Sequence, residues 1–103
     1  MADKKSIVID KDLEDLIPGY LERLRNTLES MKEMAGKGDA ESLDEIRKTG
    51  HNWKGSGKGY GFDDVTRIGA ALEQAGKDQD ADNARKLLSE LEDYLGSIDI
   101  SFG

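Results

Sequence analysis

Apolar residues recur at steps of three and four along most of the chain, in four successive stretches. The first stretch predicts one long amphipathic helix between Asp10, a candidate N-cap, and the candidate stops Gly36 and Gly38. Pro18 lies inside this stretch, so we expect the helix to be kinked there or split into a short leading helix and a longer one. The apolar positions of this helix are Leu13, Leu16, Ile17, Tyr20, Leu21, Leu24, Leu28, Met31 and Ala35.

Three shorter helices are predicted after the first. Asp39 is a plausible cap for the second helix, the third follows the break at 59–61 and stops at Gly76, and the fourth begins among the acidic residues of 78–82. Short connections favour antiparallel neighbours, so the fold class is all-α, an up-down antiparallel four-helix bundle. The inward positions are Leu43, Ile46, Gly50, Trp53, Gly57 and Tyr60, then Phe62, Val65, Ile68, Gly69, Leu72 and Ala75, then Ala84, Leu87, Leu88, Leu91, Tyr94, Leu95 and Ile98.

The residues ahead of the bundle are not predicted to be helical. Ile7, Val8 and Ile9 are too few to build a sheet in a chain with no other strand signal, so residues 1–9 are predicted to form an extended arm that packs on the bundle. A length of 103 residues has room for one modest core, so residues 1–103 are expected to form a single domain.

Composition narrows the range of functions. The net charge is -7, which argues against nucleic acid as the main partner, because phosphate backbones need a basic footprint. The chain has no cysteine and one histidine, so a disulfide is excluded and a transition-metal site is not expected. It has no apolar run of about 18 residues, and Met1–Ser6 is not followed by the apolar segment of a secretory signal. A cytoplasmic protein is the simplest interpretation.

The one histidine lies in an unusual neighbourhood. At about 100° per residue, His51 points about 130° away from the middle of the apolar face of its helix, toward solvent. Arg47, Lys54, Gly55 and Lys58 share its exposed flank, and Lys48 and Asp44 complete the patch. A protein of net negative charge therefore gathers four basic residues around its one imidazole.

A lone exposed histidine usually has no function, and a run of lysines is usually a solvated helix face. Three features favour function here. Neighbouring cations favour the neutral imidazole, which has a free nucleophilic lone pair, and they would stabilise a phosphoryl group once it is attached. Gly55 costs about 1 kcal/mol relative to alanine in a helix. Its missing side chain leaves open space beside His51, as a docking partner would require.

The segment His51-Asn52-Trp53-Lys54-Gly55-Ser56-Gly57, followed by Tyr60-Gly61-Phe62 and by Leu72-Glu73, resembles the signature of histidine-containing phosphotransfer (HPt) domains. That signature is a histidine, two further residues, Lys-Gly-Ser and a small residue, then an apolar-Gly pair and a Leu-Glu pair on the next helix. The resemblance covers nearly the whole chain, because the long first helix and the closing fourth helix also fit the bundle of this family.

The resemblance implies a role for each matching position. His51 would accept the phosphoryl group on Nε2, Lys54 would screen its charge, and Gly55 would make room for the partner. Gly57 would let helices approach closely, with Gly61 as the glycine of the apolar-Gly pair. Glu73 holds the position that orients the imidazole through Nδ1, and a carboxylate there favours the protonated ring, against the lysines. Asp44, Arg47, Lys48 and Lys58 are expected to contribute to the docking surface, whose apolar part we place at Leu16 or Tyr20.

The implied function is that of a phosphoryl carrier in a two-component phosphorelay, and not of an enzyme. Its partners would be response-regulator receiver domains and a sensor or hybrid histidine kinase, with the chain itself a monomer. No cofactor is expected on this chain, because Mg²⁺ belongs to the receiver partner. A receiver-docking adaptor without phosphotransfer stays open as the alternative, and an autonomous phosphatase or kinase fragment is the weakest reading, because nothing here resembles an ATP site.

Overall fold

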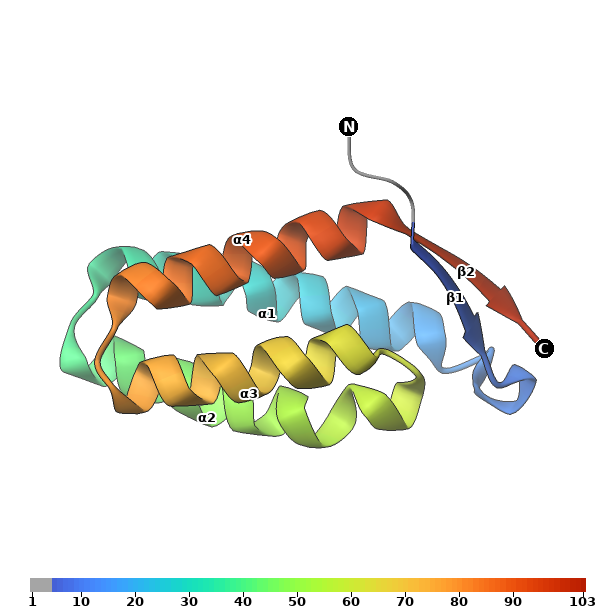
Figure 1. The fold of residues 1–103 in the computed structure, drawn as a ribbon, viewed down its shortest axis with the longest axis horizontal. Helices are drawn as coiled ribbons and strands as arrows, with labels where there is room; N and C mark the ends of the chain where they lie inside the picture. Colours follow the sequence, from blue (N-terminus) through green and yellow to red (C-terminus); the bar gives the residue numbers. More distant parts are fainter. Residues whose placement is uncertain (1–4) are drawn as a thin grey trace.

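Four helices packed as a bundle make up most of the molecule, as the apolar pattern predicts (Figure 1). The computed structural model describes residues 5–103. The first four residues of the predicted N-terminal arm lie outside this range. In chain order the elements are β1 (Lys5–Ile9), the 3-10 turn η1 (Lys11–Leu13), α1 (Ile17–Lys37), α2 (Ala40–Ser56), the 3-10 turn η2 (Lys58–Tyr60), α3 (Asp63–Lys77), α4 (Ala81–Ser97) and β2 (Ile98–Phe102).

The first helix is split rather than kinked. Asp10 caps η1, where its side chain accepts a hydrogen bond from the Asp12 amide at 2.9 Å, and it does not cap the long helix. Pro18 lies in the first turn of α1, where the missing amide hydrogen costs nothing. The proline therefore starts the long helix and does not bend it.

Two of the glycines predicted as helix stops lie inside helices. α1 continues through Gly36 and ends at Gly38, which takes the left-handed conformation at φ 67°. Gly76 lies inside α3, where a Cβ would meet the Arg47 Cβ and the Leu43 carbonyl oxygen at 2.7 Å. Gly76 is therefore a packing residue, and the sequence prediction of a stop there is wrong.

The ends of the second and fourth helices also differ from the prediction. The Asp39 side chain caps α2 by accepting a hydrogen bond from the Ser42 amide at 3.0 Å. The helix ends at Ser56, so Gly57 and Tyr60 lie beyond it, at its C-cap and on η2. Ile98 does not extend the fourth helix, because it is the first residue of β2.

A two-stranded parallel sheet joins the two ends of the described chain, which contradicts the prediction that no sheet forms. β1 pairs with β2 from Lys5 opposite Ile98 to Ile9 opposite Phe102 (Figure 1). In the described part of the predicted arm, Ile9 packs on the bundle: it is 1% exposed, and its Cγ1 would lie 3.1 Å from a Cβ at position 61.

One apolar cluster fills the interior and includes residues from β1 and all four helices. α2 and α3 pack more closely than any other pair of helices. Glycines make this possible, because a Cβ at Gly50 or Gly69 would lie within 2.8 Å of backbone atoms of the facing helix. The fully buried large side chains are Phe62, Ile9, Met31, Leu43, Ile46, Ile68, Leu72, Leu88, Leu91 and Val65.

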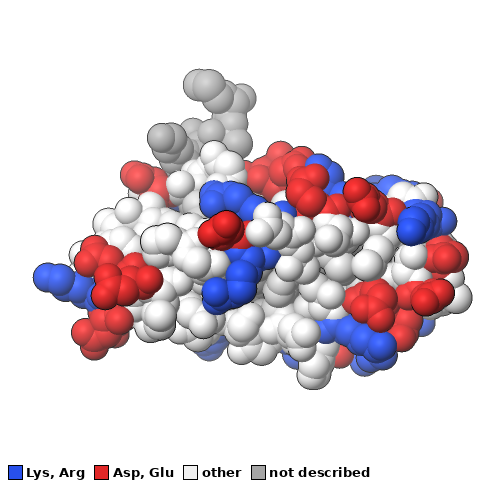
Figure 2. All heavy atoms as spheres, turned by 180° about the vertical axis from the view of Figure 1, so that it is seen from behind, with Lys and Arg blue, Asp and Glu red and all other residues white. Residues whose placement is uncertain are grey.

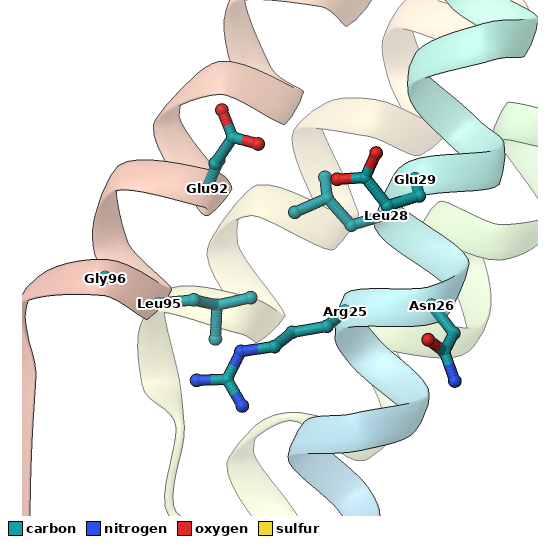
Figure 3. Close-up of a pocket in the computed structure, with 7 residues that line it drawn as sticks. All are labelled: Arg25, Asn26, Leu28, Glu29, Glu92, Leu95 and Gly96. Carbon is teal, nitrogen blue, oxygen red and sulfur yellow. The ribbon is translucent and has the colours of Figure 1, made fainter.

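The seam between α1 and α4 is more open. Figure 3 shows a groove there, with Leu28 and Leu95 between the two helices and the charged side chains of Arg25, Glu29 and Glu92 around them. The Nζ of Lys32 on α1 lies 2.7 Å from a carboxylate oxygen of Glu92 on α4 and ties the two helices together. Among residues 5–103, the helices are all too short or too polar to span a membrane.

The β1 strand is also held to α3 by charge. Lys5 forms an ion pair with Asp64 in the first turn of α3, and its ammonium group lies 5.9 Å from the centre of the Tyr94 ring. The hydrogen bond from Lys5 lowers the pKa of Asp64, against the effect of burial, and the charges of Lys5 and Arg67 add to the lowering.

We expect Asp64→Asn to lower the free energy of unfolding at pH 7 by about 0.5–1 kcal/mol, because the ion pair is partly exposed. A carboxylate whose pKa is lowered in the folded protein stabilises it above its ordinary pKa of 3.8, and this stabilisation is lost as the pH falls through the folded value. Urea unfolding at a series of pH values should show the difference from wild type shrinking below pH 4. Asp63→Asn, with the same charge change one residue earlier in the same helix, is the control, and an equal loss in both variants would contradict the assignment to Lys5.

Candidate functional site

The histidine side chain projects from α2 into solvent. His51 follows Gly50, which is buried against α3, and precedes Trp53, which is 6% exposed, so the inward face of the helix is fixed on both sides of it. The His51 side chain is 67% exposed. Because Gly50 and Trp53 occupy the inward face of α2, the helical spacing places the imidazole of His51 on the outer face.

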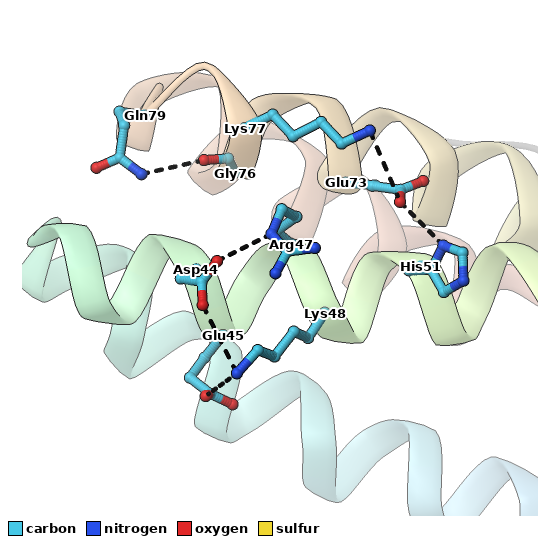
Figure 4. A network of polar contacts seen from close by, with 9 residues as sticks. All are labelled: Asp44, Glu45, Arg47, Lys48, His51, Glu73, Gly76, Lys77 and Gln79. Atoms are coloured by element: carbon cyan, nitrogen blue, oxygen red, sulfur yellow. Dashed lines mark hydrogen bonds and ion pairs between the residues drawn. The ribbon is translucent and has the colours of Figure 1, made fainter.

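Glu73 on α3 holds the imidazole from one side. The His51 Nδ1 lies 2.9 Å from a Glu73 carboxylate oxygen, and Figure 4 shows the ring turned toward this carboxylate across the seam between the two helices. A carboxylate can only accept, so Nδ1 carries the proton and donates it. The neutral ring then has its lone pair on Nε2, the nitrogen that Glu73 does not contact.

The close approach of α2 and α3 explains how this hydrogen bond between the two helices is reached. Gly50, next to His51, would place a Cβ 2.6 Å from the backbone nitrogen of Glu73 itself. Any side chain at position 50 would therefore push the two helices apart where the hydrogen bond crosses the seam. From the sequence, Gly50 is expected to reflect close packing on the inward face of the helix, and its contact with Glu73 appears only in three dimensions.

The Glu73 carboxylate is itself largely enclosed, with 12% of its side chain exposed. Burial raises the pKa of Glu73, but the hydrogen bond from His51 and the charges of His51, Lys54 and Lys77 outweigh it, so the pKa is lowered overall. Glu73 is therefore a stable anion at neutral pH, and it is suited to hold the proton on Nδ1.

Two lysines, one from each helix, flank this carboxylate. The Nζ of Lys54 lies 3.5 Å from one Glu73 oxygen, and the Nζ of Lys77 lies 4.0 Å from the other. Both lysine side chains are about half exposed, so both can move toward solvent. Lys77 is not among the site residues predicted from the sequence. Its spacing of four residues from Glu73 on the same helix is the signal that could have found it.

The other predicted cations of the patch lie further from the ring. Arg47 is ion-paired with Asp44 at 2.9 Å, and Lys48 lies 3.6 Å from Asp44 and 3.4 Å from Glu45. Figure 4 shows these pairs along α2, on the side of His51 that leads back toward the start of the helix. They form a mixed-charge surface beside the site and do not contact the imidazole within hydrogen-bonding distance.

Four of the predicted residues lie in the last turn of α2 or just beyond it. A Cβ at Gly55 would have no heavy atom within 4 Å, so this surface is open. A Cβ at Gly57 would lie 2.6 Å from the backbone nitrogen of Thr66, which keeps the end of α2 against α3. The exposed Lys58 follows, with its amide donating to the Thr66 hydroxyl at 2.7 Å, and Gly61 takes a φ of 93° at the end of η2.

Aromatic rings support the end of α2. Tyr20 stacks on Tyr60 with centroids 4.1 Å apart and on Phe62 at 5.6 Å, and its hydroxyl lies 3.5 Å from the Ser56 hydroxyl. Tyr20 is 5% exposed, whereas Leu16 is 53% exposed. Leu16 is therefore the only one of the two predicted docking residues that presents a large apolar surface.

The arrangement supports nucleophilic chemistry. Within residues 5–103, no three histidine, aspartate or glutamate side chains come together in a way that could hold a metal ion. The site instead has one oriented imidazole with a free Nε2, one largely enclosed carboxylate and two half-exposed lysine ammonium groups. This combination can accept a group that carries negative charge and keep it within reach of solvent.

The comparison with known families agrees with this chemistry. The family model described as Hpt domain matches residues 11–99. Searches found no match among curated proteins and none among solved structures. Hpt domains are phosphoryl carriers that interact with receiver domains and histidine kinases. Since the match covers most of the 103 residues, this chain belongs to the Hpt domain family, whose function is histidine phosphotransfer in a phosphorelay.

Proposed function

We propose that this chain accepts a phosphoryl group on Nε2 of His51 from the aspartyl phosphate of a receiver domain and later passes it to another receiver. One observation carries the proposal. Glu73 accepts the hydrogen bond from Nδ1 at 2.9 Å, while the His51 side chain is 67% exposed, so the nucleophilic nitrogen is oriented and open to a partner.

The transfer step follows from this geometry. The Nε2 lone pair attacks phosphorus in line, the N–P bond forms, and the bond from phosphorus to the aspartate oxygen breaks and leaves a carboxylate on the receiver. The Nδ1 proton stays on the ring, which becomes positively charged, and the Glu73 carboxylate stabilises that charge. The reverse sequence of bond changes returns the phosphoryl group to a second receiver.

We assign the two flanking lysines to the phosphoryl group. Before transfer, Lys54 and Lys77 lie beside Glu73 at 3.5 and 4.0 Å. After transfer, the group adds negative charge within reach of the same ammonium groups, and a charge-assisted contact with a phosphoryl oxygen is stronger than a loose pair at 4 Å. The Mg²⁺ for the reaction belongs to the receiver.

The docking surface is proposed to surround His51 on the outer side of α1 and α2. Gly55 is its open centre, and the exposed Leu16 is an apolar contact at its edge. The mixed charges of Asp44, Arg47 and Lys48 on one side and Lys58 on the other would set the choice of partner. We further propose that residues 1–103 form one such domain, with residues 1–9 as its N-terminal arm.

Gly55→Leu tests whether docking, and not only a reactive histidine, is part of the function. The variant should stay folded, because no atom lies within 4 Å of the added Cβ. Transfer from phosphorylated receiver domains should fall at least about tenfold, since a leucine here intrudes on a closely packed interface. Labelling by a small phosphoramidate donor, which needs no protein interface, should fall much less.

The control is Gly36→Leu, which adds the same side chain at an equally open helical position on α1. It should transfer at the wild-type rate. Equal transfer by both variants would contradict docking at Gly55. Receiver binding without any transfer by the wild type would favour the adaptor function instead.

A further inference from the structure

The outer edge of β2 has no strand beside it. β2 pairs with β1 along one side, and the described part of the chain contributes no third strand to the sheet. An edge strand presents backbone N–H and C=O groups that another extended chain can pair with. Proteins commonly block such edges with charged residues, especially lysine, or with proline; β2 has no lysine or proline, and its one charged residue is Asp99.

An apolar hollow lies beside this strand. It has a volume of about 440 Å³ and lies between β2 and the first turns of α1. Its apolar lining comes from Ile17, Pro18, Leu21, Ile100 and Phe102. The inward side chains of β2 are only half buried, so the two strands do not finish covering the bundle at this end.

A third strand would fit the geometry of the hollow. Neighbouring strands lie about 4.8 Å apart, and alternate side chains point to the same face of a sheet. A strand added to β2 would continue the sheet toward α1, with every second side chain directed into the hollow. Apolar side chains at these positions would cover Ile100 and Phe102 and fill the space against α1.

The charge around this end of the molecule bears on which side chains an added strand would carry. Asp99 on β2 and Glu14 at the hollow are both exposed, and neither forms an ion pair with the described residues. Asp10, Asp12 and Asp15 lie in the segment that directly follows β1. Figure 2 shows a group of acidic side chains at the end that carries the strands in Figure 1, and further acidic groups along one edge and at the other end. Arg25, which lines the hollow together with Glu14, and Lys11 offset part of this charge.

We propose that the free edge of β2 is a docking site for an extended segment of a partner protein, in which apolar side chains alternate with basic ones. The apolar side chains enter the hollow between β2 and α1, and the basic ones lie on the opposite face of the sheet, with Asp99. Glu14 at the hollow and the acidic segment 10–15 add negative charge around this end. A second copy of this chain fits less well, because it would bring the same acidic residues to the interface from a protein of net charge -7. The site is separate from His51 and does not depend on the phosphotransfer proposal.

The test uses the full chain and a capped heptapeptide of alternating lysine and valine, followed by amide NMR at low ionic strength. Saturable shifts are expected at 98–102 and at 14–21. The same peptide with glutamate in place of lysine should not bind. Two further peptides are each N-methylated at one of the two alternating sets of backbone amides. One of them should lose binding and the other should keep it, because only one edge of an added strand pairs with β2.

Charge-reversed variants locate the site. Asp99→Lys together with Glu14→Lys should weaken binding of the lysine peptide by about fivefold or more, and by less at high salt. Glu33→Lys, an exposed position toward the other end of α1, should have little effect. Absence of saturable shifts, shifts confined to other surfaces, or equal binding of both N-methylated peptides would overturn the proposal. Self-association through β2, seen by light scattering and abolished by the double variant, would overturn it in favour of a second copy.

Discussion

Gly69→Ala should destabilise the bundle by about 2–4 kcal/mol, the cost of overpacking a site that cannot relax. The added Cβ would lie 2.5 Å from the Lys54 backbone nitrogen, 2.8 Å from the Gly50 carbonyl oxygen and 2.8 Å from the Trp53 Cβ. Two of these are backbone atoms of α2, so no side-chain rotation removes the clash. The helices must separate, and the close α2–α3 seam is lost.

Gly36→Ala is the matched control, because it makes the same substitution inside a helix with no atom within 4 Å of the new Cβ. It should stabilise the protein by about 0.5–1 kcal/mol through helix propensity and the entropy of the unfolded chain. Urea denaturation of both variants measures the difference. If Gly69→Ala were as stable as wild type, the close packing of α2 on α3 would be wrong.

Glu73→Ala should slow phosphotransfer through His51 by about tenfold to a hundredfold, the range typical for loss of a residue that orients a functional imidazole. The variant loses both the acceptor of the Nδ1 proton and the anion that stabilises the phosphorylated ring. Glu73→Gln keeps an acceptor oxygen and loses only the charge, so its rate should lie between those of Glu73→Ala and wild type.

Transfer from a phosphorylated receiver is measured at a saturating receiver concentration. The rate then reports the transfer step, so a slow variant cannot be explained by weaker receiver binding. Gln74→Ala, a substitution of the next and exposed residue of α3, is the control and should transfer at the wild-type rate. Wild-type rates in Glu73→Ala would contradict the role of the 2.9 Å hydrogen bond.

The helices could be predicted from the sequence because each buries a regular apolar stripe and two of them have an aspartate cap. Asp39 and Asp80 both accept a backbone amide hydrogen bond at the start of a helix. The glycines were harder to interpret. Gly38 ends a helix because it takes a positive φ. Gly76 lies inside a helix, at a position where Arg47 and Leu43 leave no room for a Cβ. Only the three-dimensional contact separates these two uses of the same residue.

The sheet could not be predicted from local pattern. Ile98 continues the apolar spacing of α4, so the first residue of β2 was predicted to belong to that helix. Its partner, β1, lies at the opposite end of the sequence, and short strands gain stability only once such a distant pair meets. The alternation of Ile98, Ile100 and Phe102 is the one local signal of a strand.

The site was predicted in outline. The exposure of His51 follows from helical spacing, and the family resemblance pointed to Glu73. The distribution of the cations did not follow, because Arg47 and Lys48 pair with acids of their own helix while Lys77 arrives from α3. A basic side chain can pair with an acid of its own helix or approach the site from a neighbouring helix. Which of the two occurs depends on distances between helices that the sequence does not contain.

Phosphorylation of the purified chain by a small phosphoramidate donor, beside a His51→Gln control, tests the central claim most directly. We predict acid-labile, alkali-stable phosphate on the wild type, assigned to Nε2 of His51 by ³¹P and ¹⁵N NMR, and none on folded His51→Gln. Equal labelling of both proteins, or no labelling of folded wild type by a donor that labels a known phosphohistidine protein, would contradict it.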